Sequence, residues 1–216
     1  ANPVTFTCSK PDRYWGGFIG TSATNKVMAS YTFFCKSGVH TTGDYNYGHA
    51  HRQALFYSEN GDLNIDHCYI IDHVGQIFYP LSSTVAIKNS LIQRAKTGGQ
   101  INQSHITIEN SVFTDFPDDS FLFQDEDNDG LYLSGSDAAI NNSIFMYAKD
   151  DGLDSGASEG GEIVVTNSRF ESNFHEGAAL SSGGTASKQH TFIGCTFTNC
   201  GQGLELGYSS PNHQVS

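Results

Sequence analysis

The sequence predicts an all-β fold, a right-handed parallel β-helix of about seven stacked coils with an asparagine ladder. Two observations support this prediction. A short apolar pattern recurs six times between residues 63 and 197. The chain is also rich in turn-forming and strand-forming residues, with 23 Gly, 15 Phe and 10 Tyr. Such a composition is typical of many short strands joined by tight turns.

The repeat reads apolar, x, apolar, x, Asn, Ser, x, apolar. It occurs as LNIDHCYI (63–70), VAIKNSLI (85–92), ITIENSVF (106–113), AINNSIF (139–145), IVVTNSRF (163–170) and TFIGCTF (191–197). Its closing residues are 22, 21, 32, 25 and 27 positions apart, which is a solenoid period. The chain lacks the leucine-rich repeat consensus and a helical period, so β-branched alternation favours the parallel β-helix.

Stacking the repeats places residues of one kind in columns. The residues that close the repeats are apolar, and so are those five positions earlier, from Ile65 to Phe192. We expect both columns to point inward. Asn89, Asn110, Asn142 and Asn167 share a third column, which predicts an asparagine ladder that satisfies a buried turn.

The rest of the chain gives weaker signals. We expect a single domain, 1–216, with irregular N-terminal coils in 1–60 and regular coils in 61–216. Within 1–60 we expect strands near 15–18 and 27–34, and a loop at 45–52. Second strands of the coils are expected at 76–80, 130–135, 152–156, 177–182 and 203–209. Residues 213–216 read as the start of another strand, so we expect further coils beyond them in the natural protein, covering an open edge.

Charge and cysteine content limit the function classes. The formal net charge of -12 repels nucleic-acid phosphates, and no run of about 18 apolar residues predicts a membrane span. The polar opening has no signal peptide, and we expect a mature secreted or cell-surface protein. The five cysteines form no CxxC pair, which argues against zinc. Cys8 and Cys35 are a possible disulfide, whereas Cys68 and Cys195 are expected as buried thiols.

Acidic residues concentrate in two stretches, 125–130 and 149–156. Aligning the coils on the glycine of each second strand stacks Asp129, Asp151 and Glu176. Aligning them on the closing apolar residue stacks 118–119, 150–151 and 175–176 instead. Either register brings acids of neighbouring coils together, about 4.8 Å apart. Hard oxygen clusters suit calcium, and we predict a Ca²⁺ site made by the acids Asp127, Asp129, Asp150, Asp151, Asp154 and Glu176.

The sequence contains partial patterns for two other kinds of metal site. The stretch 125–130 resembles the first half of an EF-hand loop, but position 136 is Ser where a bidentate Glu is needed. His49, His51 and His175 would form a transition-metal site only if the fold brought them together.

The ladder, the coil length and the Asp150-Asp151-x-x-Asp154 turn resemble the calcium-dependent pectate lyases and related polysaccharide lyases of parallel β-helix fold. They also resemble β-helix domains of large secreted or surface proteins of bacteria. The resemblance covers about residues 60–216. It implies calcium held by this turn with Asp129 or Asp127 from the preceding coil. It also implies an acidic polysaccharide as ligand or substrate.

Four functions remain open at this point. We expect a calcium-binding module that binds an acidic polysaccharide, with sugar rings stacked on the tyrosines Tyr45, Tyr47, Tyr79, Tyr132 and Tyr208. An active lyase would need Lys149 or Arg94 as the base, because the coils after Asp154 offer acids such as Glu176 where a base is wanted. A glycoside hydrolase would use carboxylates such as Asp119, Asp151 and Glu176. A purely structural solenoid is the fourth.

Overall fold

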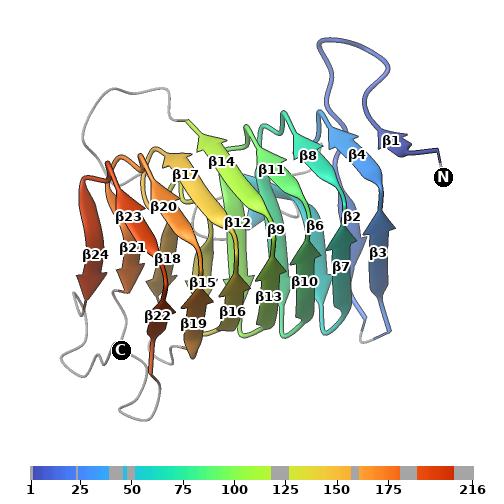
Figure 1. The fold of residues 1–216 in the computed structure, drawn as a ribbon. Helices are drawn as coiled ribbons and strands as arrows, with labels where there is room; N and C mark the ends of the chain where they lie inside the picture. Colours follow the sequence, from blue (N-terminus) through green and yellow to red (C-terminus); the bar gives the residue numbers. More distant parts are fainter. Residues whose placement is uncertain are drawn as a thin grey trace.

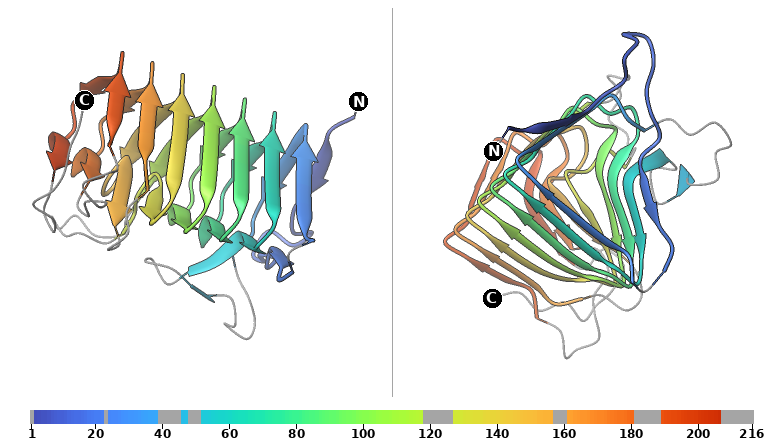
Figure 2. Two further views of the ribbon diagram at one scale, coloured as in Figure 1. Left: turned by 90° about the horizontal axis from the view of Figure 1, so that it is seen from below. Right: turned by 90° about the vertical axis from the view of Figure 1, so that its right-hand side faces the viewer.

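The computed structural model describes residues 2–22, 24–38, 46–47, 52–117, 127–156, 161–180 and 189–206. Within these ranges the chain forms a right-handed parallel β-helix, as the repeat predicts. Three sheets run along the solenoid, and its coils stack from the blue end to the red end in Figure 1. Figure 2 shows the three-sided cross-section. No helix in the described part of the chain has the length and apolar character needed to cross a membrane.

Each complete coil contributes one strand to each sheet. Sheet I contains β3 (Lys26–Ser30), β7 (Asp62–Asp66), β10 (Thr84–Lys88), β13 (His105–Glu109), β16 (Asp137–Asn141), β19 (Ile163–Thr166) and β22 (Thr191–Ile193). Sheet II contains β1 (Val4–Phe6), β4 (Thr32–Cys35), β8 (Tyr69–Ile71), β11 (Leu91–Gln93), β14 (Val112–Phe116), β17 (Ile144–Ala148), β20 (Arg169–Glu171) and β23 (Thr196–Thr198). Sheet III contains β2 (Phe18–Gly20), β6 (Arg52–Glu59), β9 (Gln76–Leu81), β12 (Thr97–Asn102), β15 (Tyr132–Ser134), β18 (Leu153–Gly156), β21 (Glu176–Leu180) and β24 (Gln202–Leu206), with β5 (Asn46–Tyr47) antiparallel to β6.

The described residues therefore make seven complete coils, one for each strand of sheet I. The repeat spans the corner between sheets I and II, so it contains the end of one strand and the start of the next. Regular stacking starts at β3 and so extends further toward the N-terminus than the repeat indicates. The turn residue of that first coil is Tyr31, with a φ of 51°, in place of the asparagine that marks later coils.

The two apolar columns pack in the centre of the solenoid, as predicted. Ile87 pairs with Ile65 on one side and with Ile108 on the other, and all three are fully buried. The closing residues form an aromatic stack, with ring centroids 4.9 Å apart for Phe113 and Phe145 and 5.4 Å for Phe145 and Phe170. Parallel stacking of identical side chains fixes the register, because a slip of one residue would turn the column toward solvent.

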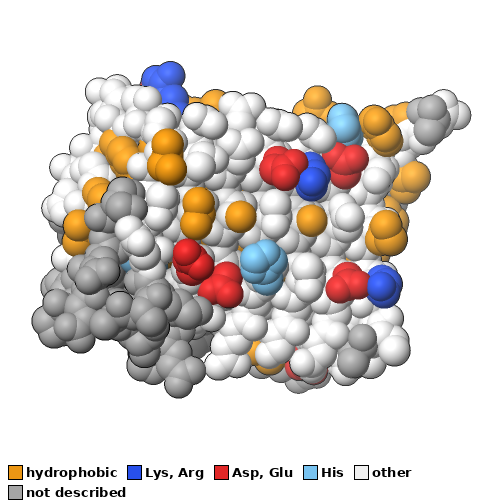
Figure 3. All heavy atoms as spheres, turned by 60° about the horizontal axis from the view of Figure 1, so that its bottom comes forward, with side chains coloured by type: hydrophobic (Ala, Val, Ile, Leu, Met, Phe, Trp, Pro, Cys, Tyr) orange, Lys and Arg blue, Asp and Glu red, His pale blue; other side chains and the backbone are white. Residues whose placement is uncertain are grey.

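Several charges on the outer surface are paired locally. On the long side shown in Figure 3, acidic side chains lie beside basic or histidine side chains, and hydrophobic side chains are scattered. Lys26 pairs with Asp62 at 2.8 Å, and Lys88 pairs with Glu109 at 3.0 Å. Exposed pairs of this kind add little stability, and the 11 Lys and Arg residues cannot balance the 23 acids of the chain.

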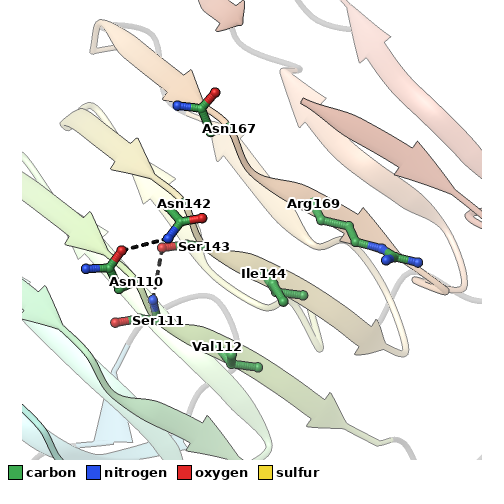
Figure 4. A pocket seen from close by; sticks show the side chains of 8 residues that line it. All are labelled: Asn110, Ser111, Val112, Asn142, Ser143, Ile144, Asn167 and Arg169. Carbon is green, nitrogen blue, oxygen red and sulfur yellow. Dashed lines mark hydrogen bonds between the residues drawn. The ribbon is translucent and has the colours of Figure 1, made fainter. Parts of the chain in front are cut away.

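The corner between sheets I and II carries the asparagine ladder. Asn142 Nδ2 donates to Asn110 Oδ1 at 2.8 Å (Figure 4). Asn110 Nδ2 in turn donates to Asn89 Oδ1 at 3.2 Å. These asparagines have φ near 50° and are exposed, because a left-handed residue at the corner points its side chain outward. The ladder is confirmed for Asn89, Asn110 and Asn142, and it lies on the outside of the turn. Asn167 Nδ2 donates instead to Asn141 Oδ1, at 3.3 Å.

On the buried side of this corner, the serines that follow the asparagines accept hydrogen bonds from backbone N–H groups. The backbone N–H of Ser90 donates to Ser111 Oγ, and that of Ser111 donates to Ser143 Oγ, both at 3.2 Å. A second serine ladder, from Ser83 through Ser104 to Ser136, lines the corner between sheets III and I. In each ladder, the serine hydroxyl of one coil accepts a hydrogen bond from the serine N–H of the neighbouring coil. The hydroxyl can still donate its own proton, so one serine per coil serves as both donor and acceptor.

All five cysteines are free thiols, so the bridge between Cys8 and Cys35 is not formed. Cys35 Sγ instead donates to Thr7 Oγ1 at 3.1 Å. Cys68 is buried as expected, whereas Cys195 is half-buried because fewer coils cover it. Burial raises the pKa of the Cys68 thiol, which keeps it protonated and unreactive.

Candidate metal centre

The acidic residues meet where sheet II leads into sheet III. Backbone hydrogen bonds join Gly98 N to Asp129 O at 3.0 Å, Gly130 N to Asp151 O at 2.7 Å and Gly152 N to Glu176 O at 3.0 Å. The glycines therefore stack, and the residue before each glycine lies in a single column. The glycine-based register is the one that the fold adopts.

Glycine is required at this point because the coils approach closely. A Cβ on Gly130 would lie 2.3 Å from Gly152 O. The same closeness brings the preceding carboxylates together. Asp129 and Asp151 are 2% and 6% exposed, so neither charge has free access to water.

Asp154 completes a set of three acids from two coils. It lies on β18, directly opposite Tyr132 of β15. One carboxylate oxygen from each of Asp129, Asp151 and Asp154 lies within 4.8 Å of the other two. This set is called the oxygen cluster below.

Backbone donors of neighbouring coils hold these carboxylates in place. Asp151 N–H donates to Asp129 Oδ1 at 3.3 Å, and Glu176 N–H donates to Asp151 Oδ1 at 2.8 Å. Asp127 N–H donates to Asp150 Oδ2 at 3.2 Å. The carboxylates of Asp129, Asp150 and Asp151 are therefore each held by a backbone donor of a neighbouring coil.

Burial and mutual repulsion raise the pKa values here. Burial, the Asp129 charge and a hydrogen bond with Glu176 raise the pKa of Asp151 to about 11. Burial and the charges of Asp154, Asp150 and Asp127 raise the pKa of Asp129 well above its usual 3.8. Burial and the charges of Asp154, Asp129 and Asp127 raise the pKa of Tyr132 to about 12. The raised pKa values show that ionising these acids together is unfavourable in the cation-free protein.

His175 is the residue that the sequence interpretation left out of the site. Its Nδ1 lies 3.4 Å from Asp150 Oδ1 and 3.7 Å from Asp151 Oδ1, and it contacts Glu176 Oε2. The sequence signal for it was its place directly before Glu176 in the acidic column. The side-chain rotamer, which turns the ring toward the preceding coil, could not be read from the sequence.

The two bases considered for lyase chemistry lie near other groups. Lys149 Nζ lies over the ring of Phe174, 4.4 Å from its centroid. Arg94 binds Asp72 with two hydrogen bonds, Nε to Oδ1 at 2.6 Å and a terminal nitrogen to Oδ2 at 3.1 Å. Several other predicted site residues lie outside the described residues: Tyr45, His49, His51, Asp118, Asp119, Asp125, Glu126 and Tyr208.

A row of side chains on the outer face of sheet III leads to the oxygen cluster. Tyr57 stacks on Tyr79 with ring centroids 5.8 Å apart and an interplanar angle of 8°. Gln100 pairs with Tyr132, and Tyr132 pairs with Asp154. The row therefore follows the solenoid axis for five coils. A crevice too narrow to admit a water molecule lies at its acidic end and is lined by Gln76, Thr97, Gly99, Gln100, Asp127, Asp129 and Tyr132.

Comparison of the chain with models of known protein families, with curated proteins and with solved structures finds no match.

Proposed function

We propose that this protein is a calcium-binding β-helix module of a secreted or cell-surface protein that binds an acidic polysaccharide. The observation that carries the proposal is the oxygen cluster. Asp129, Asp151 and Asp154 offer three carboxylates within 4.8 Å of one another, and the first two are buried. Calcium prefers oxygen ligands and tolerates irregular geometry, so it suits a site built from two successive coils.

A dication would also remove the electrostatic cost of the site. Two buried like charges about 4.8 Å apart repel by about 3 kcal/mol at an effective dielectric constant near 20. Asp127 and Asp150 lie next to the cluster, where Asp127 N–H donates to Asp150 Oδ2 at 3.2 Å. Their carboxylates add further negative potential to the site. The resemblance of the Asp150-Asp151-x-x-Asp154 turn to that of calcium-dependent polysaccharide lyases supports the same ion.

The row on sheet III supports the choice of a polysaccharide. Tyr79 and Tyr132 are half-buried on an outer face, where one face of a ring could stack on a sugar. Gln100 lies between them and supplies a polar side chain for hydroxyl groups. A uronic acid at the end of the row would place its carboxylate at the cation, which explains why an acidic protein could hold an acidic ligand.

Binding is better supported than catalysis. A lyase needs a basic side chain beside the uronate α-carbon. Lys149 lies over Phe174, and Arg94 is held by Asp72. A lyase or a hydrolase therefore stays an outcome of the test below.

Calcium binding is tested by isothermal titration calorimetry on the chelator-treated protein. We expect one calcium ion for the wild type and at least a tenfold weaker affinity for Asp154→Asn, since one of three carboxylates is lost. Glu109→Gln is the matched control, because Glu109 is an exposed acid on sheet I that pairs with Lys88. Equal calcium affinity in wild type and Asp154→Asn would refute the oxygen cluster as the site.

Polysaccharide binding is tested by affinity electrophoresis in gels that contain polygalacturonate or alginate. We expect retention in calcium and none in chelator, with weaker retention for Tyr132→Ala. Tyr69→Ala is the control, because Tyr69 is exposed on sheet II. Ultraviolet-absorbing unsaturated products would show a lyase, and new reducing ends without that absorbance would show a hydrolase. Equal mobility of the wild type in gels with and without polysaccharide, in calcium as in chelator, would refute polysaccharide binding.

A further inference from the structure

We propose that a groove on the outer face of sheet II, beside the asparagine ladder, is a second carbohydrate-binding site that takes a single chain of a neutral polysaccharide. The groove runs along the solenoid axis. It lies on a different sheet from the oxygen cluster and from the row of side chains on sheet III. It therefore depends neither on a bound cation nor on the function proposed above.

One wall of the groove is a column of hydrophobic side chains that points outward. The backbone register aligns one such residue from each of five successive coils: Phe33, Tyr69, Leu91, Val112 and Ile144. Tyr69 is 57% exposed, and the other four side chains are half-buried. Contiguous hydrophobic surface that is kept outside the core marks a site of interaction more often than single exposed residues do.

The other wall is the asparagine ladder. Figure 4 shows the two walls side by side, with Asn110, Asn142 and Asn167 in one row and Val112, Ile144 and Arg169 in the other. The space that they line has a volume of about 410 Å³. Within the ladder Asn110 donates one hydrogen bond and accepts one, whereas an amide can donate two and accept two. Donors and acceptors therefore remain for the hydroxyl groups of a ligand.

The groove leads to an aromatic pocket near the N-terminal end of the same face. The ring of Tyr31 stacks on that of His67 with centroids 4.8 Å apart, and the rings of Phe33 and Tyr69 are 6.4 Å apart. These four side chains line a pocket of about 340 Å³. Tyr31 and His67 have φ of 51° and 52° and occupy the corner position that asparagine takes in later coils. The pocket and the groove are therefore two stretches of one surface.

The dimensions of the hydrophobic column fit one extended chain better than a protein partner. Five coils about 4.8 Å apart give a length of about 19 Å, and three residues of a strand give a width of about 10 Å. The resulting area of about 200 Å² is about a quarter of the 800 Å² that each partner buries in a typical stable complex. An extended peptide binds through the free main-chain groups of a sheet edge, but the strands under this column are paired on both sides.

The charge of the groove favours a neutral ligand. Among the described residues that line its two pockets, Arg169 is the only Lys, Arg, Asp or Glu, and it pairs with Glu171 at 2.9 Å. A sugar ring has C–H groups on its face, which pack on hydrophobic side chains, and hydroxyl groups at its edge, which donate and accept as asparagine amides do. A neutral polysaccharide repeats both features along its length, as the two walls of the groove do.

The test is affinity electrophoresis in native gels that contain chelator and one of three neutral polysaccharides: hydroxyethylcellulose, glucomannan or arabinoxylan. We expect at least one of them to retard the wild type, to the same extent in calcium as in chelator. Tyr69→Ala should weaken the affinity at least about fivefold, because a ring that packs on the sugar is lost. Tyr132→Ala is the matched control, since Tyr132 lies on sheet III, and it should migrate as the wild type does.

Asn110→Gly tests the polar wall. Glycine accepts the left-handed φ of 51° at this corner, so the variant should fold with the circular dichroism spectrum of the wild type and still be retarded less. The proposal is overturned if the wild type migrates equally with and without every one of these polysaccharides. It is also overturned if both Tyr69→Ala and Asn110→Gly are retarded as strongly as the wild type. Loss of retardation in chelator or in Tyr132→Ala would assign the neutral polysaccharide to sheet III and would equally overturn it.

Discussion

Asp151→Asn should change the stability of this protein in opposite directions with and without calcium. In the calcium-free protein, the Asp151 pKa of about 11 means that the folded state holds a proton at pH 7 that the unfolded state, with a pKa near 3.8, has released. Since one pH unit corresponds to about 1.4 kcal/mol, this proton uptake costs about 4 kcal/mol of folding free energy. Asparagine resembles the protonated acid and can still accept the hydrogen bond from Glu176 N–H.

We therefore expect Asp151→Asn to unfold at a higher temperature than the wild type in chelator at pH 7. A gain of about 4 kcal/mol in a chain of this size corresponds to about 8–16 °C. In calcium at a hundred times its dissociation constant, the wild type should gain about 2.7 kcal/mol and the variant nothing. Lowering the pH from 7 to 4 in chelator should stabilise the wild type, because its folded state binds more protons, and should affect the variant less.

Thermal and urea unfolding followed by circular dichroism would measure these changes, with Glu109→Gln as a charge-matched control at an exposed acid. The reasoning is refuted if the variant is less stable than the wild type in chelator. It is also refuted if calcium stabilises both proteins equally.

Three further predictions concern the scaffold. Burial lowers the pKa of His73 to about 4, so the unfolded state binds more protons below pH 6.5. Between pH 6.5 and 4 the His73 contribution should cost about 3 kcal/mol, measured in urea unfolding as a loss of wild-type stability relative to His73→Gln. The same pH dependence in both proteins would contradict this. Ser111→Ala should cost about 1–3 kcal/mol because it leaves a buried N–H of the neighbouring coil without its acceptor. Asn110→Gly, in the exposed ladder, should change the free energy of unfolding by no more than about 0.5 kcal/mol. Equal losses of stability in Ser111→Ala and Asn110→Gly would contradict the assignment of the buried ladder to serine. Gly130→Ala should lower the melting temperature because its Cβ would lie 2.3 Å from a backbone oxygen of the next coil. Gly203→Ala, at the same repeat position, should not, because the nearest described atom, Phe197 Cβ, would lie 3.7 Å away.

The inward columns could be predicted from the sequence because each coil presents the same interior space at the same position. A side chain at the position of Ile87 must fill the same space as Ile65 and Ile108, so the same residue type recurs at the same spacing. The first coil was harder to see. Tyr31 occupies its corner with a positive φ, and no asparagine marks the turn.

Which turn residue is buried could not be read from the pattern. Asparagine and serine both suit tight turns, and they alternate along the chain at this corner. The left-handed φ of Asn110 sends its side chain outward, so the serine that follows it turns inward and accepts the buried backbone hydrogen bond. Predicting this requires the direction of the Cβ atom at the corner in addition to the residue preference.

The acidic column was predicted in its backbone register. Aligning glycines placed Asp129, Asp151 and Glu176 on one line because close backbone contact permits only glycine after them. Asp154 was also among the predicted acids, from the Asp150-Asp151-x-x-Asp154 turn, and its carboxylate lies near those of Asp129 and Asp151. The contribution of His175 depends on a rotamer, which spacing along the chain does not encode.

The contrast among the corners of the solenoid is itself an argument for a bound cation. In a solenoid, side chains at the same corner position of successive coils lie about 4.8 Å apart. Any interaction between two of them is therefore repeated along the whole column. At the two serine corners the stacked groups are neutral and bond to one another. At the third corner three acids follow one another in successive coils, with neutral Thr97 and Gln202 on either side. If all three acids were ionised, each adjacent pair would repel by about 3 kcal/mol. A neutral column avoids this repulsion, and in the acidic column either protonation or a bound dication would offset it.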